Sequence, residues 1–170
     1  MYNYNKAWKY LFLISPLLLA NCATAPVDKL GPSDVVARWL VGDDGHLYFG
    51  PNSEMSKKFS QGRGAKTFED FFYNKYSGGP AQADRVDNFD YTFTWFRAIK
   101  SWNLAEQVVG SWHDGVAEVV DDQLVCRIEN VMSLRSLLFG RQLWQMGMID
   151  PKPGEGDLRM TIEWTAPLRD

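Results

Sequence analysis

The chain has 170 residues, of which 45% are hydrophobic and 23% are charged, and its formal net charge at pH 7 is −3. This length corresponds to one domain of ordinary size with a real core. The mild acidity argues against nucleic acid or anionic lipid headgroups as the main partner.

The N-terminal segment has the layout of an export signal. Lys6 and Lys9 precede a short apolar run, 11–20, which is about half as long as a membrane-spanning helix needs to be. The run closes on Leu-Ala-Asn-Cys at residues 19–22. This pattern resembles the signal sequence and lipobox of bacterial lipoproteins, although Asn21 replaces the usual small residue at the cleavage position.

The resemblance implies that residues 1–21 are removed and that Cys22 becomes a lipidated N-terminus. Ala23, rather than Asp, follows the cysteine, which in a Gram-negative organism implies sorting to the outer membrane, with the domain facing the periplasm. Two alternatives remain open from the residues: a secretory signal cut near Ala23, or a buried N-terminal helix.

We expect a lipidated tether over 22–32, which contains two prolines, and a single globular periplasmic domain over 33–170. Lipidation of Cys22 leaves Cys126 without an intramolecular partner. Cys126 is then a buried apolar residue, an intermolecular disulfide partner or a reactive thiol. The alternation of apolar residues over 124–128 favours burial in a strand.

The first half of the domain combines ambiguous and clear patterns. Residues 33–40 fit a short helix, or 36–41 fit a strand of a hairpin that turns at Asp-Asp-Gly and returns over 46–49; the turn favours the hairpin. Polar residues 50–66 predict a loop. The aromatic spacing over 68–76 predicts a helix, with Thr67 and Asp70 as a capping box and Ser-Gly-Gly-Pro as its end.

The second half is richer in strand patterns. Aromatic and threonine residues alternate over 90–96 and predict a strand, and a helical turn is expected near 97–106. Residues 107–128 predict a three-stranded antiparallel meander, with turns at His113-Asp114-Gly115 and at Asp121-Asp122.

The apolar segment 131–149 predicts a helix, and alternation over 158–164 predicts a final strand. The sum is an α+β domain with an antiparallel sheet of five or more short strands and two or three helices.

The chain has two histidines, His46 and His113, and each lies beside aspartates at a predicted turn. If the fold brings the two together, they form a metal site or an acid–base pair. Asp-Gly beside a polar residue is also ordinary chemistry for an exposed hairpin turn, and this interpretation is favoured. We therefore predict no metal, no cofactor and no established catalytic set.

Other motifs are incomplete. Residues 64–67 match only the end of a phosphate-binding loop, whose glycines are replaced, so no nucleotide is expected. Asp84, Asp87 and Asp90 lack the pattern of a calcium loop. Ser111 lies near His113 but in no hydrolase motif.

Aromatic residues are densest between Phe68 and Trp112. They form an aromatic core, or a groove for a lipid, a glycan or a partner protein. Phe96 and Trp102 are the best candidates for exposed binding residues. Phe139 and Trp144, spread around the predicted 131–149 helix, are further candidates for docking.

Three functions are compatible with these patterns. The leading one is a non-enzymatic outer-membrane lipoprotein that holds or assembles a cell-envelope complex, for example a secretion or transport apparatus. The alternatives are a lipid- or glycan-binding periplasmic module with a pocket lined by aromatic residues, and an envelope hydrolase that uses His113 or His46. The expected partners are the membrane, reached through the N-terminal lipid, and envelope proteins.

Overall fold

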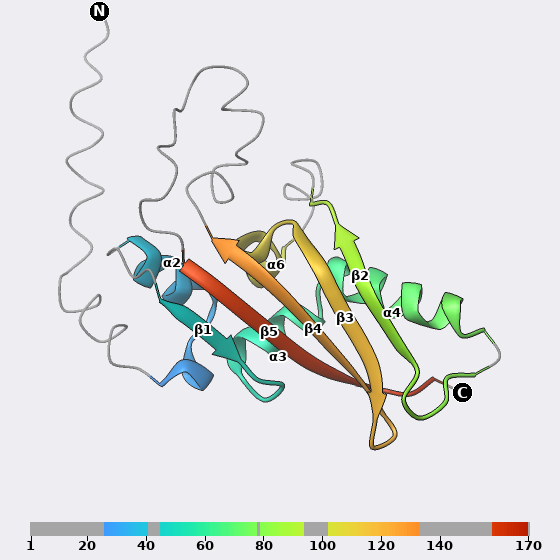
Figure 1. Ribbon diagram of the computed structural model, residues 1–170. Helices are drawn as coiled ribbons and strands as arrows, with labels where there is room; N and C mark the ends of the chain where they lie inside the picture. Colours follow the sequence, from blue (N-terminus) through green and yellow to red (C-terminus); the bar gives the residue numbers. More distant parts are fainter. Residues whose placement is uncertain (1–25, 41–44, 78, 94–101, 133–157, 170) are drawn as a thin grey trace, which may run out of the picture.

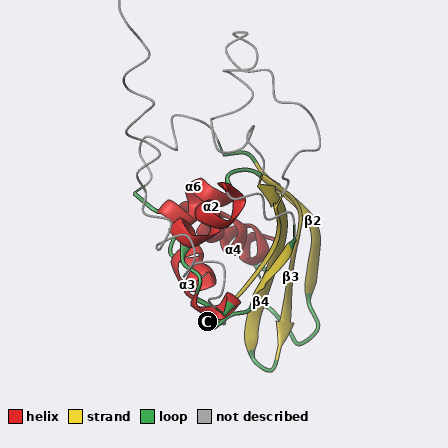
Figure 2. Ribbon diagram, turned by 90° about the vertical axis from the view of Figure 1, so that its left-hand side faces the viewer, coloured by secondary structure: helices red, strands yellow, loops and turns green. Residues whose placement is uncertain are grey.

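A five-stranded sheet with helices packed on one of its faces forms the domain (Figures 1 and 2). The computed structural model describes residues 26–40, 45–77, 79–93, 102–132 and 158–169. The strand order is β1-β5-β4-β3-β2, and every pair is antiparallel except β1 with β5, which is parallel. The predicted α+β class is therefore confirmed, with a sheet that is mixed rather than purely antiparallel. The strands are β1 His46–Phe49, β2 Arg85–Tyr91, β3 Trp112–Val120, β4 Gln123–Met132 and β5 Leu158–Pro167, and the helices are η3 Val27–Lys29, α2 Pro32–Leu40, α3 Glu54–Ser60, α4 Arg63–Lys75 and α6 Leu104–Val109.

The core lies between the sheet and the helices. Strands β3, β4 and β5 alternate, so one set of side chains is buried against the helices and the other set lies on the outer face. Phe59 of α3 meets Trp112 and Trp164 edge-on, with ring centroids 5.4 Å and 5.3 Å apart. Aromatic rings from two strands and one helix thus interlock at the centre of the domain.

The β3–β4 hairpin and β5 match the sequence prediction. Asp121 and Asp122 both have positive φ, 48° and 58°, which is the conformation that a two-residue hairpin turn requires. The predicted C-terminal strand over 158–164 is confirmed and extends to Pro167.

The predicted meander lacks its first strand, so the prediction of a strand at the start of 107–128 is wrong. Residues 107–109 belong to α6, which begins after Asn103, whose side chain accepts a hydrogen bond from the Glu106 backbone N–H at 3.1 Å. The neighbour of β3 is instead β2, which begins five residues before the predicted strand at 90 and ends at Tyr91; residues 94–96 lie outside the described part of the chain.

The expected turn at His113-Asp114-Gly115 is a β-bulge within β3. The register changes between His113, which faces Glu129, and Val116, which faces Arg127, so β3 carries one extra residue. Asp114 takes a φ of 55° at this point. A bulge bends the strand and changes where its side chains point.

The N-terminal part also differs from the prediction. Residues 32–40 form α2 rather than a strand, and β1 pairs in parallel with the distant β5 instead of forming a local hairpin. The apolar residues Val35, Val36 and Trp39 have helical spacing and pack on the core, which accounts for the helix.

The predicted loop over 50–66 contains α3 and the first turn of α4. Ser53 caps α3 by accepting a hydrogen bond from the Ser56 N–H at 3.1 Å. Helix α4 starts after Gly62, so Thr67 is not a cap; its hydroxyl donates to the Arg63 carbonyl one turn earlier, at 2.8 Å. The predicted end of this helix is confirmed, because α4 stops at Lys75.

The folded core includes residues before 33, although 22–32 was predicted to be a tether. Leu30 is 1% exposed and belongs to the core, and η3 precedes it. Of the predicted helix over 131–149, Val131 and Met132 end β4 and residues 133–149 lie outside the described part. None of the described helices is long and apolar enough to cross a bilayer.

Candidate functional site: the outer face of the sheet

The outer face of the sheet is opposite the described helices (Figure 2). It carries a concavity of about 600 Å³ near the start of β1 and β5 and the end of β4. Four of the five strands contribute to its lining, in which polar and charged residues outnumber apolar ones but do not exclude them. The lining residues are His46, Trp112, His113, Asp114, Val116, Arg127, Glu129, Asn130, Val131, Arg159 and Met160.

His46 is held at the β1 end of this concavity. Its Nε2 atom lies 2.8 Å from the hydroxyl oxygen of Thr161 on the neighbouring strand β5. Thr161 is only 5% exposed although it is polar, so the histidine supplies a hydrogen-bond partner for a buried hydroxyl. The imidazole therefore has a structural role in fixing this edge of the concavity.

His113 is held at the β3 end by the β-bulge. Its Nδ1 atom is 3.1 Å from Oδ1 of Asp90, and the backbone N–H of Asp114 donates to the same oxygen at 3.2 Å. Asp90 lies at the end of β2, so one carboxylate joins the bulge to the adjacent strand. Because both His113 and Asp90 are mostly exposed, this pair contributes little to stability.

The two histidines line the same concavity but lie at its opposite ends. Strands β5 and β4 separate β1 from β3, and three strand spacings amount to about 14 Å. That separation is too large for a shared metal ion or a direct acid–base pair. In agreement, no group of three His, Cys, Asp or Glu side chains placed to hold a metal occurs within the described ranges.

A row of polar side chains crosses the outer face from β4 to β1. The Arg127 Nε atom is 3.2 Å from Oε2 of Glu163 on β5. Partial burial raises the pKa of Tyr48 on β1, and the nearby Glu163 carboxylate raises it further by charge repulsion and a hydrogen bond to the phenol. The phenol therefore stays protonated at neutral pH and donates to Glu163.

The remaining sequence candidates have local structural roles. The Ser111 hydroxyl accepts a hydrogen bond from the Phe93 N–H at 2.8 Å, and Asp84 accepts one from the Ala81 N–H at 2.7 Å. Asp87 pairs with Arg85 at 2.8 Å. Residues 64–67, the partial phosphate-loop match, lie inside α4.

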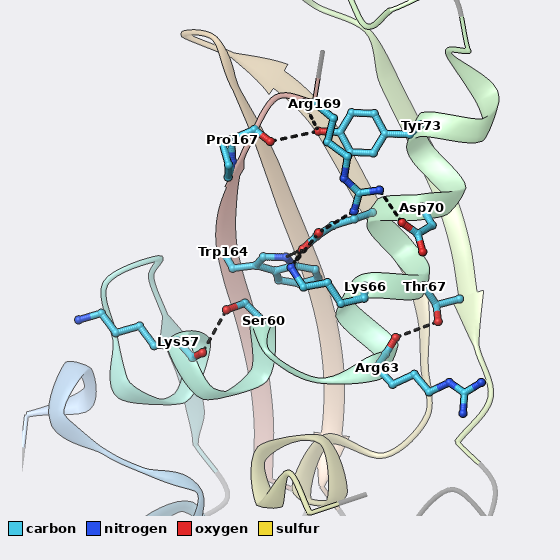
Figure 3. Close-up of polar contacts among 11 residues, drawn as sticks. Lys57, Ser60, Arg63, Lys66, Thr67, Asp70, Tyr73, Trp164, Pro167 and Arg169 are labelled. Atoms are coloured by element: carbon cyan, nitrogen blue, oxygen red, sulfur yellow. Dashed lines mark hydrogen bonds and ion pairs between the residues drawn. The ribbon is translucent and has the colours of Figure 1, made fainter.

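A buried carboxylate that sequence reasoning missed lies on the other side of the sheet (Figure 3). Glu69 on α4 is 2% exposed and accepts a hydrogen bond from the Trp164 indole N–H at 3.1 Å. Its Oε2 atom is 3.0 Å from Lys66 Nζ and 3.4 Å from Arg169. The signal was present in the sequence, because Glu69 falls between Phe68 and Phe72 on the apolar face of the helix.

Cys126 is fully buried on the same side of the sheet, as predicted from its strand pattern. Burial raises the pKa of its thiol well above the ordinary value, and the negative charge of Glu69 adds to this effect. A thiol in this environment is not ionised at neutral pH and is therefore inert.

Of the predicted binding residues, Trp102 is 98% exposed. Phe96, Phe139 and Trp144 lie outside the described residues, as does the predicted lipidation site Cys22. Most of the other described aromatic residues between 68 and 112 are not free to line a pocket, although Phe71 is 44% exposed. Phe68, Phe72, Tyr91 and Trp112 are buried in the core, and Tyr73, Tyr76, Phe89 and Phe93 pack against it.

Comparisons with known proteins give no family for this chain. No family model matches it, and neither the curated proteins nor the solved structures contain a match.

Proposed function

We propose that the chain is an outer-membrane lipoprotein, anchored through Cys22, that acts as a structural or assembly component of a cell-envelope complex. The anchor follows from the resemblance of residues 1–23 to a lipoprotein signal. The domain would face the periplasm and bind envelope proteins.

The exposure of Trp102 is the observation that carries the docking role. The other tryptophans among the described residues, Trp39, Trp112 and Trp164, are buried in the core or pack against it, whereas Trp102 is 98% exposed. Leu104, two residues later at the start of α6, is 49% exposed. Tryptophan is enriched among the residues that dominate binding energy at protein interfaces, because it buries a large rigid surface.

The concavity on the outer face favours a second candidate, a binding module for a small polar ligand. Its lining holds side chains of both charge signs, including Arg159 and Glu129, neither of which forms an ion pair within the described part of the chain. Such a lining fits a polar ligand better than a lipid tail.

Crosslinked capture of the native protein from its own membranes tests the proposal. The wild type should recover a reproducible set of envelope proteins, and Trp102→Ala should lose most of them while the melting temperature changes by less than about 2 °C. Phe71→Ala removes another exposed aromatic side chain, 44% exposed on α4, and serves as the matched control.

Cys22→Ser tests the anchor in the same cells. The variant should accumulate as an uncleaved precursor or leave the membrane fraction, because no acyl chain can be attached. Unchanged membrane fractionation of Cys22→Ser would contradict the anchor. If the wild-type protein is captured alone, the assembly role is wrong and the polar ligand becomes the better explanation.

A further inference from the structure

The tether is too short to hold the domain away from the membrane. Pro26 is the first described residue, and only four peptide units separate it from Cys22, which span at most about 14 Å when fully extended. Val27 packs against the core and Leu30 is part of it, so the folded domain begins almost at once. One surface of the domain must therefore lie close to the bilayer whenever Cys22 is acylated.

The packing of η3 determines which surface this is. Helix η3, the first element after the tether, contacts the edge strand β1 and helix α3. Strand β2 forms the opposite edge of the sheet, four strand spacings or about 19 Å away. Figure 1 shows η3, in blue, and β1 at one side of the molecule and the C-terminal end of α4 at the other.

We propose that the surface formed by η3, β1 and α3 rests on the phospholipid headgroups of the membrane that holds the lipid anchor. This inference rests on the proposed acylation of Cys22. It orients the domain, with the β1 edge at the bilayer and the β2 edge directed away from it.

The exposed side chains of this surface are of the kinds found at a membrane interface. Tyr48 on β1 is 54% exposed. Three lysines are exposed: Lys29 on η3 and Lys57 and Lys58 on α3. Figure 3 shows Lys57 pointing away from Trp164. Tyrosine and lysine place apolar stems at the acyl boundary and polar ends among the headgroups.

Acidic residues on the same surface partly balance the lysines. Asp28 lies on η3, and Glu54 on α3 is 3.9 Å from Lys58 Nζ. Three lysines against two acidic residues leave this surface slightly basic in a chain that is acidic overall. The short tether therefore sets the contact, and charge attraction adds little to it.

A matched pair of serine-to-cysteine variants measures the orientation. Ser33→Cys places a label at the start of α2, seven residues after Pro26, and Ser77→Cys places one just beyond α4; both serines are exposed. Each label is unique, because Cys22 is acylated and Cys126 is buried. The full acylated protein is reconstituted in vesicles of phosphatidylethanolamine and phosphatidylglycerol that contain an energy-acceptor lipid.

Energy transfer should place the Ser33→Cys label closer to the bilayer than the Ser77→Cys label by at least about 15 Å, close to the width of the sheet. Insertion of twelve Gly and Ser residues between Ala25 and Pro26 should reduce this difference by at least half. The inserted segment has an average span of about 19 Å and lets the domain rotate.

Equal energy transfer from the two labels in protein that carries the acyl mass would overturn the orientation and leave the anchor intact. A difference that survives the insertion would also overturn it, since the tether would not be its cause. A wild-type mass without acyl chains would overturn the anchor and the orientation together. The mass and the two distances thus separate the failure of each claim.

Discussion

Replacement of Glu69 tests whether its carboxylate stabilises the domain mainly through the buried indole of Trp164. The indole N–H donates to Glu69 at 3.1 Å, and both residues are almost completely buried. The cationic partners Lys66 and Arg169 are about half exposed, at 54% and 47%. Glu69→Ala removes all three interactions, whereas Glu69→Gln keeps an acceptor for the indole.

The expected cost of each variant follows from these exposures. An unsatisfied buried N–H costs about 1–3 kcal/mol, and each partly exposed ion pair contributes about 0–1 kcal/mol. Glu69→Ala should therefore lower the free energy of unfolding by about 3 kcal/mol, and Glu69→Gln by about 1 kcal/mol. For a domain of this size, these losses correspond to roughly 9 °C and 3 °C in melting temperature.

Urea and thermal unfolding of the protein, followed by tryptophan fluorescence, measure both values. Lys66→Ala is the matched control, because it removes one cationic partner of Glu69 and leaves the indole bond; its cost should stay near that of Glu69→Gln. If Glu69→Gln proves as costly as Glu69→Ala, the charge pairs and not the indole hydrogen bond dominate, and the reasoning is wrong.

Two further predictions concern the same core. Gly64→Ala should destabilise the domain by about 2 kcal/mol, because a Cβ at this position lies 2.5 Å from the Trp112 ring. Alanine is the better helix former, so helix propensity alone would predict the opposite sign. Thr67→Ala, at an exposed position of the same helix, is the control and should change stability by less than about 0.5 kcal/mol. Cys126 should resist thiol reagents at pH 8 in the native state and react on unfolding. Because its native pKa is raised, its contribution to stability is complete below about pH 8.5 and declines above it, as the unfolded thiol ionises; stability that stays constant to pH 10 would contradict this.

Secondary structure was predicted correctly from the sequence where the local residue pattern and the tertiary structure favour the same element. Strands β4 and β5 alternate over most of their length because one face is buried, and Asp121 and Asp122 adopt the backbone conformation that a tight hairpin needs. The class of the fold followed from these elements.

The wrong predictions concern segments whose residues are compatible with both a helix and a strand. Gln107–Trp112 contains the β-branched and aromatic residues typical of a strand. Val108 and Val109 also fit a helix, and the capping residue Asn103 favours that outcome. The partner of β1 is more than a hundred residues away, so no local pattern indicates the parallel pair.

The concavity on the outer face could not be predicted for the same reason. It depends on the register that brings His46 beside Arg159 and on the bulge at Asp114, and neither is a property of a single segment. The sequence singled out His46 and His113, but only the strand order shows that they lie at opposite ends of one site.

The parallel pair of β1 and β5 has a consequence for the order in which the sheet can assemble. Strand β5 lies between β1 and β4 in the sheet, although it follows both of them in the chain. Until residues 158–167 have been synthesised, β1 has no partner among the described strands and β4 lacks its β5 neighbour. The earlier segments therefore remain incompletely paired until the end of synthesis, and the sheet becomes complete in one late step.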